Sequence, residues 1–286
     1  MKEPEKKLLL LELNEINFDI VKSYLQKYNF KSLRRICEEN LITTRSEKEY
    51  SKLEPWIQWV SAHTGLEADE HSVYRLGDII NNNKLDQIFE VVENKGFRVG
   101  AVSPMNAVNK LKDPKYFIPD PWTETKSDNS FWSKKLSTTI KQAVNDNAKN
   151  KITLISYLIL FLAILRFAKF KNYFTYFKLA ILSFSRPWNK SLFLDLFLSD
   201  IHYSFVKKHN PNFSTLFLNA GAHIQHHFFL MSHLILSKKK VSNKVKLDPI
   251  KEMFKIYDRI IADYLTFQGY ELIIATGLSQ TPYSKP

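Results

Sequence analysis

Polar side chains that can do acid–base, nucleophilic or metal chemistry gather in four places along this sequence. One group is rich in carboxylates, one lies beside two tryptophans, one is rich in histidine and one is neutral. Each type serves a different step of group transfer, because carboxylates and imidazoles bind metals or move protons and a hydroxyl can attack. The groups are Glu12, Asn14 and Glu15; Ser61 and His63; Asn219, His223, Gln225 and His226; and Thr276–Gln280.

The histidine group has a spacing that bears on metal binding. His223 and His226 are three residues apart, so on a helix they share a face and could bind one ion. The alternative is that either ring bonds to the local backbone, and the spacing leaves both interpretations open.

The elements that must position these groups are indicated by apolar periodicity. Four short, nearly continuous apolar runs predict buried strands, and longer runs with apolar residues at helical spacing predict helices between them. Strands that alternate with helices indicate an α/β protein with a mostly parallel sheet covered on both faces, whose site lies beyond the carboxyl ends of the strands. The predicted strands are 8–13, 97–102, 214–218 and 271–275, and the predicted helices are 18–25, 85–94 and 250–267.

Composition excludes several classes of protein. With 286 residues, 44% hydrophobic and 24% charged, the chain is neither disordered nor collagen-like. The single cysteine, Cys37, allows no internal disulfide and no thiolate metal site, which indicates a reducing compartment. The seven glycines leave little room for glycine-rich phosphate loops, and the short apolar run at Leu8–Leu11 is no secretory signal. We therefore expect a cytoplasmic protein.

The positive charge is concentrated in one segment. The net charge is +12, and between Lys134 and Lys190 the only acidic residue is Asp146. This region contains an apolar run over 152–165, shorter than the roughly 20 residues that span a bilayer. The run is consistent with three structures: a transmembrane span, a helix in the membrane interface or a buried cap. The expected cytoplasmic location therefore leaves room for membrane association through 151–190. Nucleic-acid binding ranks last, because no recognition motif accompanies the charge.

The motifs together resemble the alkaline phosphatase superfamily, and within it the type I phosphodiesterase and nucleotide pyrophosphatase-like branch. Trp59–Gly65 followed by His71 is similar to the nucleophile segment of that family, and Ala222–His226 is similar to its metal-binding pair. The resemblance implies one three-layer α/β/α domain over residues 1–286 with a helical, basic and aromatic cap inserted at 130–210. It also implies Ser61 as nucleophile beside His63, and a divalent metal site for zinc or manganese.

Departures from the family pattern reduce its ligand set. Asn14, Ala222 and Gly277–Leu278 stand where the family has acidic or acidic–histidine ligands, and the sequence stops at Pro286 before a further expected histidine. We therefore expect a domain that is incomplete at its carboxyl end. Asn14, His223 and His226 remain as metal-binding candidates, and the substrate-binding candidates are Glu12, Glu15, Asn219 and Gln225.

Two functions follow from this resemblance. The first is a divergent hydrolase or group transferase acting on phosphate or sulfate esters, similar to bacterial proteins of surface-polysaccharide metabolism. The second is an inactive relative that serves as a binding or membrane-surface scaffold, because the acidic ligands are lost.

Overall fold

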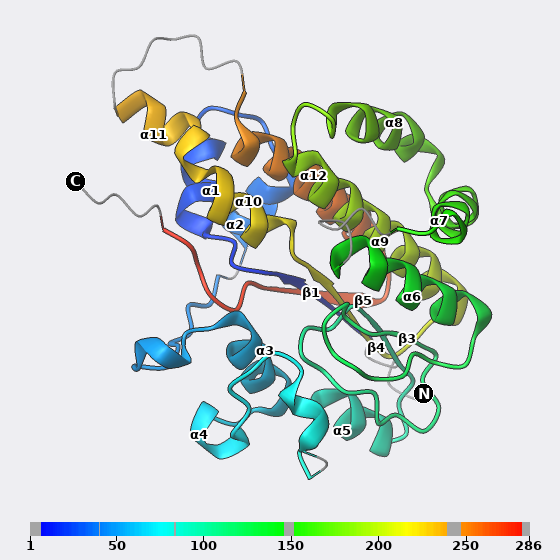
Figure 1. Cartoon of the computed structure of the whole chain (residues 1–286). Helices are drawn as coiled ribbons and strands as arrows, with labels where there is room; N and C mark the ends of the chain where they lie inside the picture. Colours follow the sequence, from blue (N-terminus) through cyan, green and yellow to red (C-terminus); the bar gives the residue numbers. More distant parts are fainter. Residues whose placement is uncertain (1–6, 40, 83, 146–151, 239–246, 282–286) are drawn as a thin grey trace.

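A five-stranded parallel sheet forms the centre of the molecule (Figure 1). The computed structural model describes residues 7–39, 41–82, 84–145, 152–238 and 247–281. All neighbouring strands run parallel, in the order β3-β2-β4-β1-β5. The predicted α/β class and parallel sheet are thus confirmed. The strands are β1 (Lys7–Leu13), β2 (Val99–Val102), β3 (Tyr116–Ile118), β4 (Phe213–Leu218) and β5 (Tyr270–Ala275).

Helices cover both faces of the sheet, because its residues alternate between two cores. Leu9 and Leu11 of β1 belong to the larger core, whereas Leu8 and Leu10 pack against the smaller core around Phe89. In Figure 1 the helices of the smaller core lie below the sheet and those of the larger core lie above it. The lower layer holds α3 (Pro55–Thr64), α4 (Ala68–His71) and α5 (Ile88–Asn94). The upper layer holds α1 (Phe18–Leu25), α2 (Lys31–Glu38), α6 (Phe131–Asn145), α9 (Trp188–His209), α10 (Ala220–Phe228) and α12 (Pro249–Tyr264).

Local signals explain where the helices that frame the site begin and end. The side chain of Asn17 accepts the amides of Asp19 and Ile20 at the start of α1. Pro55 opens α3 in the first turn, and Gly65 ends it in the left-handed conformation at φ 73°. These signals set the start of α1 and both ends of α3.

The segment 130–210 is helical, but its helices differ in their place in the fold. α6 and α9 contribute Leu136, Ile140 and Leu196 to the main core, so they belong to the layer that covers the sheet. α7 (Leu154–Phe167) and α8 (Tyr173–Leu182) lie at the margin of that layer (Figure 1). Among the described residues of 130–210, α7 and α8 are thus the helices furthest from the sheet layer. The remaining short helix, α11 (His233–Lys238), follows α10.

Two further observations bear on the sequence predictions. Within the described ranges, every helix is too short or too polar to cross a bilayer. β5 pairs with β1 and forms an edge of the sheet, and Ile273 on it is 49% exposed. The strand β3 was missed by the sequence analysis, because three residues are too few to show a period.

Candidate functional site

The predicted nucleophile Ser61 lies on α3, away from the histidines of α10. Its hydroxyl is 3.0 Å from Nε2 of His71, and it lines a surface depression formed by residues 45–69. Nδ1 of His71 accepts the amide of Val73, so Nε2 carries the ring proton and donates it to Ser61. Burial also lowers the pKa of His71. In this arrangement His71 orients the Ser61 hydroxyl but cannot take its proton.

His63 is separated from Ser61, because two residues along a helix point to different faces. Its Nε2 is 3.0 Å from the carboxylate of Glu12, and Glu12 also accepts the hydroxyl of Thr215 at 2.7 Å. Glu12 is 0% exposed and His63 3%. This pair ties α3 to β1 and β4 beneath the carboxyl edge of the sheet. A ligand at the surface does not reach Glu12, which sequence reasoning had placed among the substrate-binding residues.

Asn14 joins three elements at the carboxyl edge. Its carbonyl accepts the indole N–H of Trp59 at 2.8 Å, and its amide donates to the carbonyl of Asn219 at 2.8 Å. Because Asn14 is 1% exposed and is bonded at both ends of its amide, it acts as a fixed link between β1, α3 and the end of β4. The predicted metal ligand thus holds the loop that carries Glu15.

Glu15 is the centre of a three-residue cluster at this edge. Its carboxylate accepts from Nε2 of His226 at 2.8 Å and from the amide of Gln280, and Gln280 and His226 are 3.2 Å apart. The backbone carbonyl of Glu15 accepts the side chain of Gln225 at 2.8 Å. Glu15 has a φ of 60°, an uncommon conformation for a residue other than glycine. Such a conformation is often found at functional sites, where the surrounding bonds maintain it.

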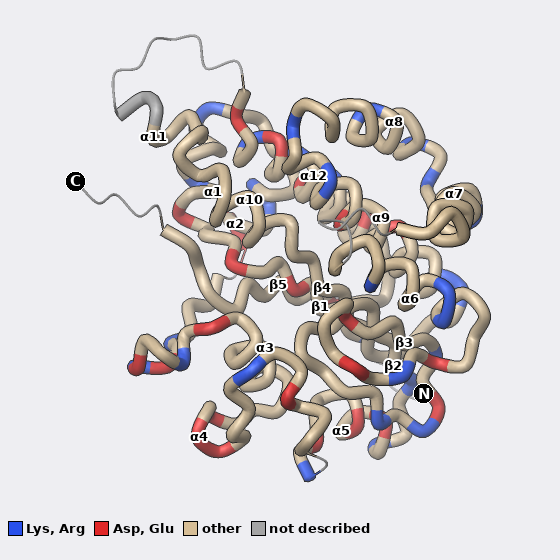
Figure 2. The backbone as a smooth tube through the Cα atoms, in the orientation of Figure 1, with Lys and Arg blue, Asp and Glu red and all other residues tan. Residues whose placement is uncertain are grey.

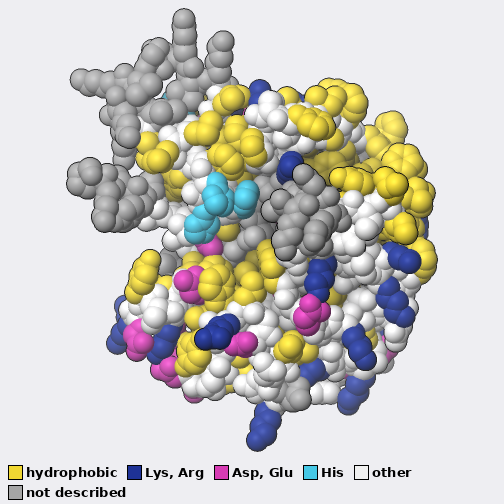
Figure 3. All heavy atoms as spheres, in the orientation of Figure 1, with side chains coloured by type: hydrophobic (Ala, Val, Ile, Leu, Met, Phe, Trp, Pro, Cys, Tyr) yellow, Lys and Arg dark blue, Asp and Glu magenta, His cyan; other side chains and the backbone are white. Residues whose placement is uncertain are grey.

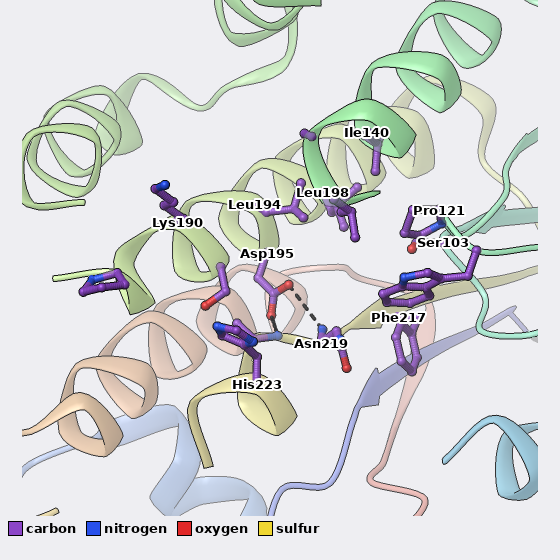
Figure 4. A pocket seen from close by; sticks show the side chains of 16 residues that line it. Ser103, Pro121, Ile140, Lys190, Leu194, Asp195, Leu198, Phe217, Asn219 and His223 are labelled. Carbon is purple, nitrogen blue, oxygen red and sulfur yellow. Dashed lines mark hydrogen bonds between the residues drawn. The ribbon is translucent and has the colours of Figure 1, made fainter. Parts of the chain in front are cut away.

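A cavity of about 420 Å³ adjoins this cluster (Figure 4). It opens at the carboxyl ends of β2, β3 and β4, with α6 and α9 forming the opposite wall. Asn219 lines the cavity and bonds to Asn14, the residue before Glu15. Most of the lining is apolar, from Trp122, Ile140 and Phe217 among others. The polar side chains in the lining are Ser103, Lys190, Ser191, Asp195, Asn219 and His223.

Asp195 is a buried carboxylate in the wall of this cavity. It accepts the amides of Asn219 and Ala220 and the hydroxyl of Tyr257, and that hydroxyl in turn accepts the amide of Gly221. Burial raises the pKa of Asp195 to about 7, against the effect of these hydrogen bonds. The amides at the start of α10 are therefore already occupied, and this helix end offers no open anion site.

The three exposed histidines of α10 do not act as one group. His226 points to Glu15, whereas His223 lines the cavity and lies against the ring of His227, with centroids 4.7 Å apart. Burial, with smaller contributions from His227 and His226, lowers the pKa of His223. Figure 3 shows histidine side chains together at the rim of a hollow. The predicted pairing of His223 with His226 on one metal is not the geometry observed.

Three residues at the site were missed by the sequence analysis. They are Ser103, Lys190 and Asp195. Ser103 directly follows a predicted strand and has a φ of 58°, and Asp195 interrupts an apolar helix, so the sequence did hold signals for both. Gln280 is 265 residues from Glu15, and patterns in a single sequence do not show that two such distant residues are in contact.

The donor set can be compared with what a divalent metal requires. Among the described residues, no three His, Cys, Asp or Glu side chains are placed to hold an ion together. Glu15 and His226 supply one carboxylate and one imidazole, and the amide oxygen of Gln280 would be the third donor if that group is turned over. These donors are fewer than the two-metal centre of the resembled family requires.

Comparisons with protein-family models, curated proteins and solved structures gave no match to this chain.

Proposed function

We propose that this protein is a hydrolase or group transferase that acts on phosphate or sulfate esters at the carboxyl edge of its sheet. The observation that carries the proposal is the convergence of Glu15, His226 and Gln280 beside a cavity of about 420 Å³. In this arrangement the cluster holds one divalent cation, and the cavity holds the organic part of the ester.

The lining of the cavity suits an ester with an apolar or cyclic body and an anionic group. Trp122 and Phe217 supply flat apolar surface, and Lys190 supplies a cation that forms no ion pair with any described residue. His223 lines the cavity and lies on the same helix as His226 of the Glu15 cluster. An ester that fills the cavity thus meets a cation and an imidazole at its polar end.

Each polar group of the site would have a separate role in the reaction. Glu15 and His226 would bind the cation, which supplies Lewis-acid polarisation and a more acidic bound water. The lowered pKa of His223 keeps its ring neutral near pH 7, so it can accept a proton from an attacking water or alcohol. Lys190 would neutralise charge on the ester oxygens.

Metal binding is the first test. We expect the purified protein to bind about one zinc or manganese ion, with the affinity of Glu15→Gln and His226→Gln reduced 10-fold or more. His227→Gln is the matched control, since His227 is an exposed neighbour outside the cluster. Equal metal affinity in all four proteins would remove the proposed centre.

Turnover of nitrophenyl phosphodiester and sulfate substrates is the second test. Activity lost in Glu15→Gln and His223→Gln but kept in Ser61→Ala would support the carboxyl-edge site. Activity lost only in Ser61→Ala would instead support the predicted nucleophile Ser61 and the depression on α3. Inactivity of the metal-loaded protein on all these esters would count against an enzyme.

Binding without turnover is the second candidate. It is favoured because, among the described residues, no hydroxyl that lines the cavity forms a hydrogen bond to a histidine. A phosphate or sulfate ester that raises the melting temperature but is never converted would support this scaffold function.

A further inference from the structure

The outward faces of α7 and α8 carry an unusual amount of exposed apolar surface. On α8 and its flanks, exposed apolar side chains recur every three or four residues, which places them on one stripe. α7 carries a second stripe with the same spacing. The α8 stripe is Phe170, Phe174, Phe177, Ile181 and Phe184, and the α7 stripe is Leu154, Leu158, Phe161 and Leu165.

These side chains are exposed on helices that are firmly placed. The opposite face of α7 packs into the main core through Ala163 and Phe167, and α8 does so through Tyr176 and Leu179. Because α7 is apolar on both faces, packing against the core buries one face and leaves the other exposed. Figure 3 shows hydrophobic side chains gathered over α7 and α8.

The turn between the two helices is fixed by buried carboxylates of neighbouring helices. Asp200 on α9 accepts both the amide of Asn172 and the hydroxyl of Tyr176, at 2.8 and 2.9 Å. Lys169 lies 3.1 Å from Asp200 and 2.6 Å from Asp263 on α12. The stripes are therefore presented by an anchored pair of helices.

The charged residues of α7 and α8 themselves are all basic. From residue 152 to residue 190 the sequence contains no aspartate or glutamate, and the charged residues that Figure 2 shows along α7 and α8 are basic. Arg166 and Lys178 are exposed and form no ion pair within the described ranges. An apolar stripe with basic neighbours is typical of a helix that lies in the interface of an anionic membrane.

We propose that α7 and α8 dock the protein on the surface of an anionic lipid bilayer, with the two stripes inserted at the level of the head groups. α7 has 14 residues and is about 21 Å long, too short to cross a hydrocarbon core of about 30 Å, so it lies along the surface. A second copy of the chain fits this face less well, because a two-fold contact would bring the basic residues of both copies together with no acidic partner from α7 or α8. This proposal does not depend on the proposed ester chemistry.

Vesicle flotation tests the apolar contribution. The chain should float with vesicles of phosphatidylcholine and phosphatidylserine and much less with pure phosphatidylcholine. Phe170→Ser, Phe174→Ser and Phe184→Ser, combined, should weaken binding on the order of 100-fold, since each side chain is largely exposed and its removal does not touch the core. The matched control combines Ile42→Ser, Tyr50→Ser and Phe131→Ser, which removes exposed apolar groups elsewhere and should leave flotation unchanged.

A charge variant tests the electrostatic contribution separately. Arg166→Gln with Lys178→Gln should weaken binding about 30-fold at low salt, because each basic residue near the surface contributes about 1 kcal/mol. Lys95→Gln with Lys112→Gln, two exposed lysines far along the sequence, is the control. Absence of flotation, or equal loss in the stripe variant and its control, would overturn the proposal. A third outcome would also overturn it: the chain does not float, sedimentation shows a dimer, and the phenylalanine variant abolishes that dimer. The face would then bind a second copy of the chain.

Discussion

The buried carboxylate of Asp195 makes a strong prediction about how stability depends on pH. Its pKa rises from 3.8 to about 7 on folding, so between these values the native protein binds more protons than the unfolded chain. Stability from this group is therefore lost as the pH rises through that window. The shift of about 3 units, at 1.36 kcal/mol each, sets an upper limit of about 4 kcal/mol.

Asp195→Asn removes this titration. An asparagine keeps one acceptor oxygen and places an amide near the N–H of Asn219, so one buried donor loses its partner at a cost of about 1–3 kcal/mol. From about pH 5 to about pH 8 the wild-type protein loses about 3 kcal/mol that the variant does not lose. The variant should therefore be the less stable protein in acid and should approach or overtake the wild type in mild alkali.

Urea unfolding measures this difference. Tryptophan fluorescence and circular dichroism should give coincident transitions, with an unchanged m-value, at each pH. Asp258→Asn is the control, because Asp258 accepts the amides of Ser32 and Leu33 on a half-exposed face and reports the cost of the amide exchange alone. A stability difference for Asp195→Asn that stays constant across this pH range would refute the reasoning.

Three other substitutions have expected outcomes. Gly100→Ala should destabilise the protein by about 1–3 kcal/mol in urea unfolding, because its Cβ would lie 2.3 Å from the ring of Tyr116, and Tyr116→Leu in the same chain should recover part of the loss. Burial lowers the pKa of His202 from 6.5 to about 3, so the stability that neutral His202 contributes is present above pH 6.5 and is lost in acid. His202→Gln should therefore reduce the acid-induced loss of stability between about pH 6.5 and 5 by about 2 kcal/mol. An equal dependence of unfolding free energy on pH in both proteins would contradict this. Gly221→Ala would place a Cβ 2.5 Å from Ile16 and 3.2 Å from the carbonyl of Asn14, so it should weaken zinc or manganese binding measured by titration calorimetry, and unchanged affinity would show that the loop tolerates the shift.

Local patterns were enough to predict the sheet but not its full membership. The run Leu8–Leu13 and the other long strands are apolar because both of their faces are covered, and that signal survives in a single sequence. β3 covers only Tyr116–Ile118, and its place beside β2 depends on pairing with a distant segment. The order of the five strands therefore could not be predicted from periodicity.

The site was predicted in part. Placing Glu15, Asn219 and His226 at strand ends was sufficient to bring them to one edge, as the structure shows. Ser61 and His63 were placed by motif spacing, and a helix sends residues two apart to different surroundings. The surroundings of Ser61 and His63 depend on how α3 packs against the sheet, which the motif spacing does not contain.

The bonds around Glu15 have a practical consequence for labelling this protein. The backbone carbonyl of Gln280 accepts the side chain of Asn17, and its own side chain bonds to Glu15, so position 280 is fixed at the rim of the site. A label attached within 276–281 would therefore lie beside the cluster and disturb these bonds. β1, by contrast, begins at Lys7 on the opposite edge of the sheet. Fluorophores for the binding experiments therefore belong at the amino edge of the sheet, away from the cluster.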